Sequence, residues 1–223
     1  MVKSKISIQE DIFQTNDQIA VINNKLLKAA NLYSINIMAS PGAGKTSLIE
    51  RTVRYFSPGL RLMVIDGDIA TSFDADRAEA AGAYSVQVNT GGECHLDANM
   101  VNAVLAKSKL DQFDLLILEN VGNLVCPASF KLGTHQNVLV ASIPEGDDKP
   151  YKYPGIYRGV DVLVINKIDL LPYVPFRMDF FRAGVEALNP GLKTFEVSCQ
   201  TGEGLQNWFT WLLLQVNNAR NKD

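Results

Sequence analysis

The sequence predicts an α/β protein with a doubly wound, mostly parallel sheet. Three observations support this prediction. Strand-like and helix-like segments alternate along most of the 223 residues, a length that suits one domain. Two strand-like segments, 115–118 and 162–165, are continuously apolar, which is typical of parallel strands covered on both faces. A glycine-rich turn between the first strand and the next helix has the form of a phosphate-binding loop.

The bulk composition limits the classes of protein. Hydrophobic residues make up 47% of the chain and charged residues 20%, as in ordinary globular proteins. The net charge is −3 and there is no basic run, which argues against a nucleic-acid binder. No apolar run reaches the ~18–20 residues of a membrane span. Because the N-terminus lacks a signal-peptide core, we predict a cytoplasmic protein, and the three cysteines are expected to be free thiols.

The chain divides into three predicted parts. Residues 1–32 are expected to form an N-terminal helical extension packed on the domain, because apolar residues recur there at near-helical spacing. Residues 33–218 form the predicted GTPase domain, and residues 219–223 form a polar tail. The polar residues from Asn217 onward are expected to fray. The apolar positions of the first part are Ile12, Phe13, Ile19, Ile22, Leu26 and Leu27.

Within the domain, the hydrophobic pattern predicts an alternation of strands and helices. The predicted strands are Ser34–Ala39, Arg61–Asp66, Tyr84–Val88, Leu115–Glu119, Val138–Ile143, Val160–Asn166 and Thr194–Ser198. The predicted helices are Lys45–Tyr55, Asp74–Ala81, Leu96–Lys107, Pro175–Leu188 and Gly204–Val216. The polar, proline-containing connection Pro144–Gly159 is too long for a simple turn, so we expect it to be a functional loop.

The first strand and the first of these helices flank the pattern G-x-x-x-x-G-K-[ST], with Ala39 in the first glycine position. Backbone N–H groups of such a loop converge on phosphate oxygens. Lys45 can reach the β- and γ-phosphates, and the Thr46 hydroxyl can ligate Mg²⁺. The alternative, an incidental glycine-rich turn, is disfavoured by the flanking strand and helix. The predicted phosphate-binding residues are Gly42, Ala43, Gly44, Lys45, Thr46 and Ser47.

A second motif indicates which base is bound. Asn166, Lys167 and Asp169 form an N-K-x-D string at the end of an apolar strand. A carboxylate at Asp169 can accept two hydrogen bonds from guanine, whereas adenine offers no such pair of donors, so the site discriminates between them. The stem of Lys167 would lie along the base. Ser198 and Cys199 follow the last strand, in a loop similar to the one that closes over guanine in GTPases.

Acidic residues are expected to complete the phosphate end. We assign Asp68 and Glu119 to Mg²⁺, together with Thr46. The E-x-x-G string that starts at Glu119 resembles the D-x-x-G of GTPases, so Gly122 is expected to sense the γ-phosphate. Asp74 either positions the attacking water or caps the helix that follows, and the sequence leaves both open. Since no Gln or Arg is evident near the water, hydrolysis is expected to be slow.

Two of the three thiols form a candidate metal site. Cys94 and His95 are adjacent soft ligands suited to Ni²⁺ or Zn²⁺, and Cys126 lies shortly after Gly122. Three ligands do not complete a tetrahedral site, but a two-fold axis would double them. The alternative is that each cysteine is a small buried hydrophobe, and the residues alone do not decide between the two. If triphosphate orders the segment around Gly122, metal affinity and nucleotide state are coupled. His135 is expected to be a surface residue.

Taken together, these strings resemble the HypB family of hydrogenase nickel-incorporation GTPases. The resemblance implies a P-loop NTPase fold of the SIMIBI-like type. It also implies a GTP/GDP- and Mg²⁺-binding GTPase that forms a homodimer with nucleotide. It also implies binding of Ni²⁺ or Zn²⁺ between subunits through Cys94, His95 and Cys126. Nickel would pass to the [NiFe]-hydrogenase large-subunit precursor with the help of a zinc-bearing, HypA-like chaperone. The matching strings are 40–46, 67–70, 89–91, 94–98, 119–127, 145–150 and 166–169.

The sequence also departs from that family. The segment 1–32 lacks the Cys-rich or His-rich tract of some members, so no separate nickel store is expected there. Asn99 replaces a second histidine, which puts a second metal in question, and Lys131 replaces a usual aspartate. A urease-type nickel-insertion GTPase has the motif C-P-H, but Ala128 follows Cys126-Pro127 here. A P-loop small-molecule kinase is disfavoured by the N-K-x-D string. A metal-binding scaffold without hydrolysis remains a further alternative.

Overall fold

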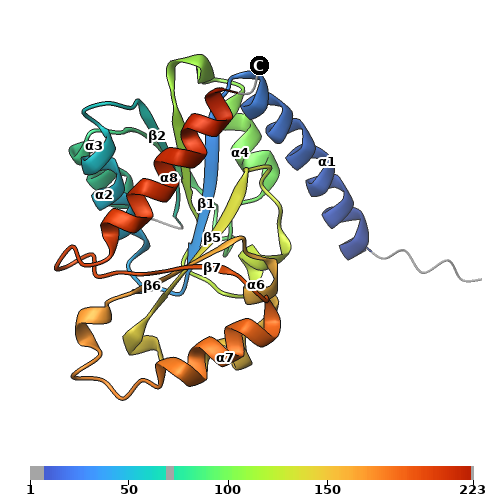
Figure 1. The fold of residues 1–223 in the computed structure, drawn as a ribbon. Helices are drawn as coiled ribbons and strands as arrows, with labels where there is room; N and C mark the ends of the chain where they lie inside the picture. Colours follow the sequence, from blue (N-terminus) through green and yellow to red (C-terminus); the bar gives the residue numbers. More distant parts are fainter. Residues whose placement is uncertain (1–7, 69–72, 222–223) are drawn as a thin grey trace, which may run out of the picture.

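A seven-stranded parallel sheet forms the centre of the computed structural model, which describes residues 8–68 and 73–221 (Figure 1). The strand order is β3-β2-β4-β1-β5-β6-β7, and every neighbouring pair is parallel. This confirms the predicted α/β doubly wound class. The strands are β1 (Tyr33–Ala39), β2 (Leu62–Asp68), β3 (Tyr84–Asn89), β4 (Leu115–Glu119), β5 (Gln136–Ser142), β6 (Val162–Asn166) and β7 (Lys193–Glu196).

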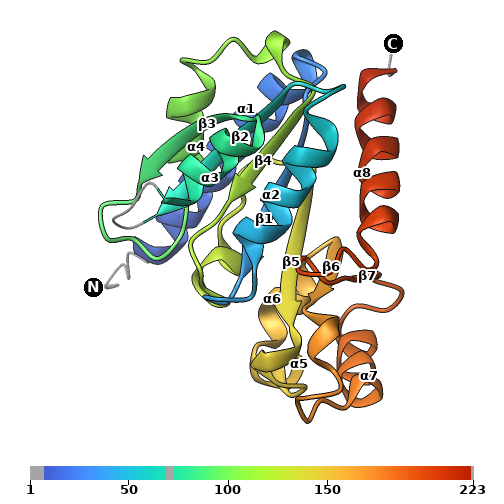
Figure 2. The same cartoon turned by 90° about the vertical axis from the view of Figure 1, so that its left-hand side faces the viewer.

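Helices cover both faces of the sheet (Figures 1 and 2). On one face α2, α3 and α8 pack on alternate residues of the strands. On the other face, α1 and α4 cover the half around β2 and β4, while α6 and α7 cover the half around β5 and β6. The helices are α1 (Ile8–Ala29), α2 (Lys45–Phe56), α3 (Phe73–Ala81), α4 (Ala98–Leu105), α5 (Lys149–Lys152), α6 (Pro154–Gly159), α7 (Met178–Leu188) and α8 (Leu205–Arg220).

Burial of apolar strand residues provides most of the core. The side chains of β4 are all buried, which explains why its sequence is apolar without alternation. The largest fully buried side chain is Trp208 of α8, whose Nε1–H donates to the Thr52 hydroxyl of α2 at 2.9 Å. This bond satisfies the indole donor inside the core and fixes α8 against α2.

The N-terminal helix α1 has an unusual distribution of side chains. Its buried face contains Asn16 and Asn23, which hydrogen-bond to the domain, whereas Ile12 and Ile22 are 52% and 50% exposed. The attachment of α1 therefore depends on hydrogen bonds as well as on apolar contacts such as buried Leu27. Residues 1–7 of the predicted extension lie outside the described residues.

Two helix boundaries differ from the sequence prediction in ways that the hydrogen bonds and ion pairs explain. Helix α4 begins at Ala98 rather than at 96, because the Asp97 carboxylate accepts a hydrogen bond from Met100 N at 2.7 Å and caps the helix. Helix α8 continues to Arg220, so the expectation that the chain frays from Asn217 is wrong for residues 217–220. The Arg220 guanidinium lies 3.7 Å from Asp114. Residues 222–223 lie outside the described part.

The connection 144–159 is not a loop, as the sequence suggested, but mostly short helices. A 3-10 turn, Ile143–Glu145, is followed by α5 and α6. A proline stands in the first turn of each of the three, where its missing N–H leaves no helical bond unmade. The prolines that suggested an irregular segment therefore start helices here.

The fold places all the predicted motifs at one end of the sheet. The phosphate loop follows β1, the acidic residues end β2 and β4, and the N-K-x-D string follows β6. Since parallel strands end on the same side, these segments meet at the carboxyl edge, where ligands bind in such sheets. Within the described residues, no helix is both long and apolar enough to cross a membrane.

Candidate nucleotide and metal site

The carboxyl ends of β1, β2 and β4 surround a cavity of about 530 Å³. Most of the residues that the sequence assigned to phosphate and Mg²⁺ line it, whereas Ala43 is buried beneath the loop. Lys45 and Thr46 stand at the start of α2, where backbone N–H groups and the positive end of the helix favour an anion. The predicted residues that line the cavity are Gly42, Gly44, Lys45, Thr46, Ser47, Asp68, Asp74, Glu119, Gly122 and Lys167.

The phosphate loop packs closely against Asn166 of the N-K-x-D segment. Gly44 has a φ of 99°, and a β-carbon there would overlap with the amide nitrogen of Asn166. That amide donates to Ala43 O at 3.0 Å. The second glycine of the motif is therefore required both for its backbone conformation and for the close approach of Asn166.

Three carboxylates converge below the phosphate loop. Oxygen atoms of Asp66, Asp74 and Glu119 all lie within 4.8 Å of one another. The Thr46 hydroxyl donates to Glu119 Oε1 at 2.6 Å. Among the described residues, the buried atoms Asp66 Oδ2 and Glu119 Oε2 have no hydrogen-bond partner. Unpartnered buried carboxylate oxygens beside a hydroxyl fit a hard divalent cation such as Mg²⁺.

The electrostatics of these carboxylates support that interpretation. Burial is the largest cause that raises the pKa of Glu119 to about 8 and the pKa of Asp66 to about 7. Neighbouring carboxylates contribute to both shifts, and Lys45 opposes them. A bound cation supplies the charge that would keep both groups ionised at neutral pH.

The structure changes three assignments at this end of the site. The β2 carboxylate that joins Glu119 in the cluster is Asp66, which the sequence analysis missed, whereas Asp68 lies at the end of β2 in the cavity wall. Asp74 does not cap the following helix, because α3 begins one residue earlier, at Phe73. Contrary to the expectation that no arginine is near, Arg77 of α3 lines the cavity. Its guanidinium contacts Glu50 at 2.8 Å and Asp74 at 3.9 Å. Positions 69–72 of the predicted flexible segment lie outside the described residues.

The N-K-x-D segment joins the phosphate loop to the loop after β7. Asn166 Oδ1 accepts from Lys167 N at 2.8 Å and from Cys199 N at 3.1 Å. Lys167 has a φ of 62°, and its ammonium donates to Gly42 O at 2.6 Å. Asp169 Oδ1 is buried and has no partner among the described residues, which suits a guanine N–H donor.

The loop after β7 contributes through its backbone. Ser198 Oγ accepts from Thr201 N at 3.0 Å, and Arg51 donates to Cys199 O at 2.9 Å. Burial raises the pKa of the Cys199 thiol to about 11. Cys199 is thus a packed thiol whose N–H fixes Asn166, and it is distinct from the other two cysteines.

Cys94, His95 and Cys126 come together as the sequence suggested. Their donor atoms all lie within 4.8 Å of one another, and Cys94 Sγ lies 3.8 Å from His95 Nδ1. The neighbouring Cys126 thiol raises the pKa of Cys94, and burial lowers the pKa of His95, which favours the neutral, ligating imidazole. Both cysteines are only half-buried, which argues against their being inert core residues. His135 lies apart from this group, with Nδ1 2.8 Å from Ser34 Oγ.

Helix α1 connects the two segments that carry the candidate ligands Cys94, His95 and Cys126. Asn16 accepts from Ala98 N at 2.8 Å and donates to Lys131 O at 2.9 Å. Asn23 donates to Ala98 O at 2.8 Å and to Leu132 O at 3.0 Å. Ala98 follows the Cys94–His95 pair, and residues 131–132 follow Cys126, so both asparagines bridge the same two segments.

Aromatic ring contacts also connect α1 to the candidate ligand His95. The ring of Phe130 lies 3.9 Å from that of His95, and the ring of Phe13 on α1 lies 5.1 Å from Phe130. The imidazole of His95 is therefore packed, and its orientation depends on the position of α1.

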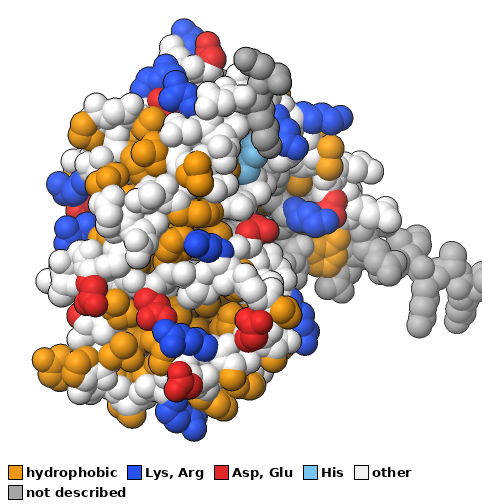
Figure 3. Space-filling view, viewed as in Figure 1, with side chains coloured by type: hydrophobic (Ala, Val, Ile, Leu, Met, Phe, Trp, Pro, Cys, Tyr) orange, Lys and Arg blue, Asp and Glu red, His pale blue; other side chains and the backbone are white. Residues whose placement is uncertain are grey.

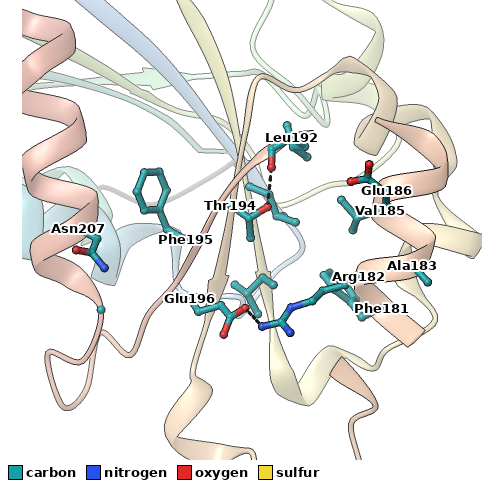
Figure 4. A pocket seen from close by; sticks show the side chains of 13 residues that line it. Phe181, Arg182, Ala183, Val185, Glu186, Leu192, Thr194, Phe195, Glu196 and Asn207 are labelled. Carbon is teal, nitrogen blue, oxygen red and sulfur yellow. Dashed lines mark hydrogen bonds and ion pairs between the residues drawn. The ribbon is translucent and has the colours of Figure 1, made fainter. Parts of the chain in front are cut away.

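A second cavity, of about 580 Å³, lies between α7, β7 and the start of α8, away from the phosphate loop (Figure 4). Apolar side chains such as Phe181 and Val185 form part of its wall, and Arg182 and Glu196 form an ion pair within it. On the side of the molecule seen in Figure 1, Figure 3 shows hydrophobic side chains in the lower part with acidic and basic groups around them. None of the predicted site residues lines this cavity.

Comparisons with known proteins identify the family of this chain. Residues 33–196 match the model of the CobW/HypB/UreG nucleotide-binding domain. Hydrogenase maturation factor HypB of Rhizobium leguminosarum bv. viciae is 42% identical over 215 residues, which cover 96% of this chain and 71% of that protein.

Two solved structures are similar over almost their whole length. HypB of Archaeoglobus fulgidus superposes with a TM-score of 0.85 at 36% identity, covering 92% of this chain and all of that one. HypB of Helicobacter pylori in complex with nickel superposes with a TM-score of 0.85 at 34% identity, covering 94% and 99%. The chain therefore belongs to the HypB family of hydrogenase maturation factors, within the CobW/HypB/UreG nucleotide-binding proteins.

Proposed function

We propose that this protein is a GTPase that couples GTP binding and hydrolysis to the delivery of Ni²⁺ during [NiFe]-hydrogenase maturation. The observation that carries the proposal is the short segment 119–126, which contributes to both candidate sites. Glu119 belongs to the carboxylate cluster, Gly122 packs against Pro41 of the phosphate loop, and Cys126 belongs to the thiol cluster. A change at the γ-phosphate therefore has a short covalent path to a metal ligand.

The nucleotide chemistry follows from the cavity. Lys45 and the N–H groups of the phosphate loop would hold the β- and γ-phosphates, and Asp169 would select guanine. Thr46, Asp66 and Glu119 would hold Mg²⁺, directly or through water, and the ion would supply positive charge beside the phosphates. Asp74 stands where it could orient the attacking water, and Arg77 lines the same cavity, where its guanidinium could offset transition-state charge.

The thiol cluster supports a site shared between two copies of this chain. Cys94, His95 and Cys126 provide three soft ligands, fewer than a closed site needs, so a nucleotide-dependent homodimer would complete the coordination of Ni²⁺ or Zn²⁺. Val125, next to Cys126, is 61% exposed, as a residue at an interface would be in a single chain. The nickel complex of the Helicobacter pylori relative supports Ni²⁺ as the cargo.

The proposed partners are a zinc-bearing, HypA-like chaperone and the hydrogenase large-subunit precursor, which would receive the nickel. Membership of a hydrogenase maturation family supports both. Free thiols that must stay reduced to bind nickel suit a cytoplasmic location.

The proposal is tested by measuring the Ni²⁺ dissociation constant with GDP and with a non-hydrolysable GTP analogue, while recording subunit mass. We expect the two constants to differ by fivefold or more, since allosteric coupling is typically ~5–150-fold. Lys45→Ala should abolish the effect of nucleotide, and Cys94→Ala should keep nucleotide binding and lose tight nickel binding. Equal nickel constants in both nucleotide states, or unchanged nickel binding in Cys94→Ala, would contradict the proposal.

A further inference from the structure

A buried asparagine stands between the phosphate cavity and the thiol cluster. Asn120 follows β4 directly and is 1% exposed. Its Oδ1 accepts from two backbone donors, Val121 N and Leu96 N, both at 3.0 Å. Because two N–H groups converge on one atom, that atom must be the amide oxygen, so the amide nitrogen points to Asn36.

The sheet anchors this side chain. Asn120 Nδ2 donates to Asn36 Oδ1 on β1 at 3.2 Å, and Asn36 Nδ2 donates to Asn137 Oδ1 on β5 at 3.1 Å. Asn120 N also donates to Ile37 O at 3.0 Å. Three side-chain amides are thus hydrogen-bonded in a row, from the end of β4 across β1 to β5. The Asn120 nitrogen is bound to the sheet, whereas its oxygen accepts from residues outside the sheet.

The two backbone donors belong to different sites. Val121 precedes Gly122, where a β-carbon would lie 3.2 Å from Pro41 of the phosphate loop. Leu96 follows His95, and its side chain packs against Gly67 so closely that a β-carbon on Gly67 would overlap with it. One oxygen therefore joins the segment expected to sense the γ-phosphate to the segment that carries two metal ligands. A longer contact, 3.4 Å from Asn123 Nδ2 to Cys94 O, joins the same segments.

We infer that Asn120 is the positioning residue that transmits nucleotide state to the Cys94–His95 segment, by holding Val121 N–H and Leu96 N–H on one anchored oxygen. This inference rests on the proposed coupling of GTP and nickel. If γ-phosphate draws Val121 and Gly122 toward the phosphate loop, Asn120 must follow or leave a buried donor unpaired, which is costly. Leu96 is held by the same atom, so the metal segment moves with the nucleotide segment.

The test compares nickel dissociation constants of the full-length chain, with GDP and with a non-hydrolysable GTP analogue, in the parent and in Asn120→Ala. The parent ratio is expected to lie at fivefold or more, and the ratio in Asn120→Ala within about twofold of 1. Asn120→Asp can still accept both N–H groups but loses the donor to Asn36 Oδ1, so its ratio should fall between those of the parent and of Asn120→Ala. Asn189→Ala is the control, because the Asn189 side chain also bonds to two backbone groups, donating to Tyr157 O and Val160 O, but belongs to neither candidate site.

The outcomes separate this inference from the function on which it rests. A parent ratio of 1 contradicts the proposed coupling itself. A parent ratio of fivefold or more that persists in Asn120→Ala overturns the role of Asn120 alone. If circular dichroism shows that Asn120→Ala does not fold, amide hydrogen exchange in the parent decides. Exchange at Leu96 and Val121 should then change together between the two nucleotides, and a response at Val121 without one at Leu96 overturns the inference.

Discussion

Replacing Glu119 by glutamine tests the electrostatics of the carboxylate cluster. The Glu119 side chain is 2% exposed and accepts a hydrogen bond from Thr46. Burial raises its pKa from 4.5 to about 8. Between these two pH values the unfolded chain has lost the proton while the folded protein keeps it, so stability falls as pH rises. Glutamine accepts the same bond from Thr46 but has no proton to lose.

The size of the effect follows from the pKa. One pH unit of difference in proton binding corresponds to ~1.4 kcal/mol, and at pH 8 about half of the folded protein has already lost the Glu119 proton, so between pH 6 and pH 8 the parent should lose about 2 kcal/mol more than Glu119→Gln. For a chain of this size, each kcal/mol corresponds to ~2–4 °C in Tm, so the difference should reach about 4–8 °C.

The assay is thermal unfolding of nucleotide-free protein with a chelator, at several pH values from 6 to 9. Adding Mg²⁺ should restore the stability of the parent at high pH and have little effect on Glu119→Gln. Glu79→Gln, an exposed carboxylate on α3, is the control for a general loss of charge. If the parent and Glu119→Gln show the same dependence of Tm on pH, Glu119 is not held protonated by burial, and the argument for a cation at this cluster fails.

Three further predictions concern other parts of the site. Asp169→Asn should lower GTP affinity at least about a hundredfold by calorimetry, because an amide donor would face guanine donors, and should favour xanthosine triphosphate, which has a carbonyl there. Arg77→Ala should lower kcat for GTP hydrolysis about tenfold or more with little change in KM; a raised KM with unchanged kcat would show that Arg77 serves binding. Gly204→Ala should cost about 2 kcal/mol or more by denaturant unfolding, because φ is 72° and a β-carbon would overlap with Glu196 O. Gly202→Ala, also at positive φ but with open space around it, should cost less.

The sequence predicted the fold well because its strongest signals are local. The apolar run 115–119 can be buried on both sides only as a central parallel strand, and the structure has β4 at those residues. The phosphate loop and the N-K-x-D string depend on backbone geometry that a few residues determine, such as Gly44. Their positions could therefore be predicted without the tertiary structure.

The missed residues depend on register and on helix placement. Asp66 and Asp68 are two residues apart on β2, so their side chains point to the same side of the sheet. The strand pattern therefore cannot show which of the two lies beside Glu119. The pairing of β2 with β4 decides, because Asp66 lies opposite Glu119 and Asp68 lies beyond the end of β4. Arg77 enters the cavity only because α3 packs beside α2, where Glu50 pairs with it. These arrangements need the assembled sheet.

The hydrogen bonds of α1 have a consequence for control of the thiol cluster from a distance. Asn16 and Asn23 hydrogen-bond to the backbone of both segments that follow the candidate ligands. A hydrogen bond is lost over a displacement of about an ångström, whereas an apolar contact tolerates such a shift. A molecule that binds the exposed Ile12 and Ile22 of α1 and tilts the helix would break the hydrogen bonds to Ala98 and to residues 131–132 together. Binding at that surface, which contains no candidate ligand and no nucleotide group, would then alter the proposed metal site.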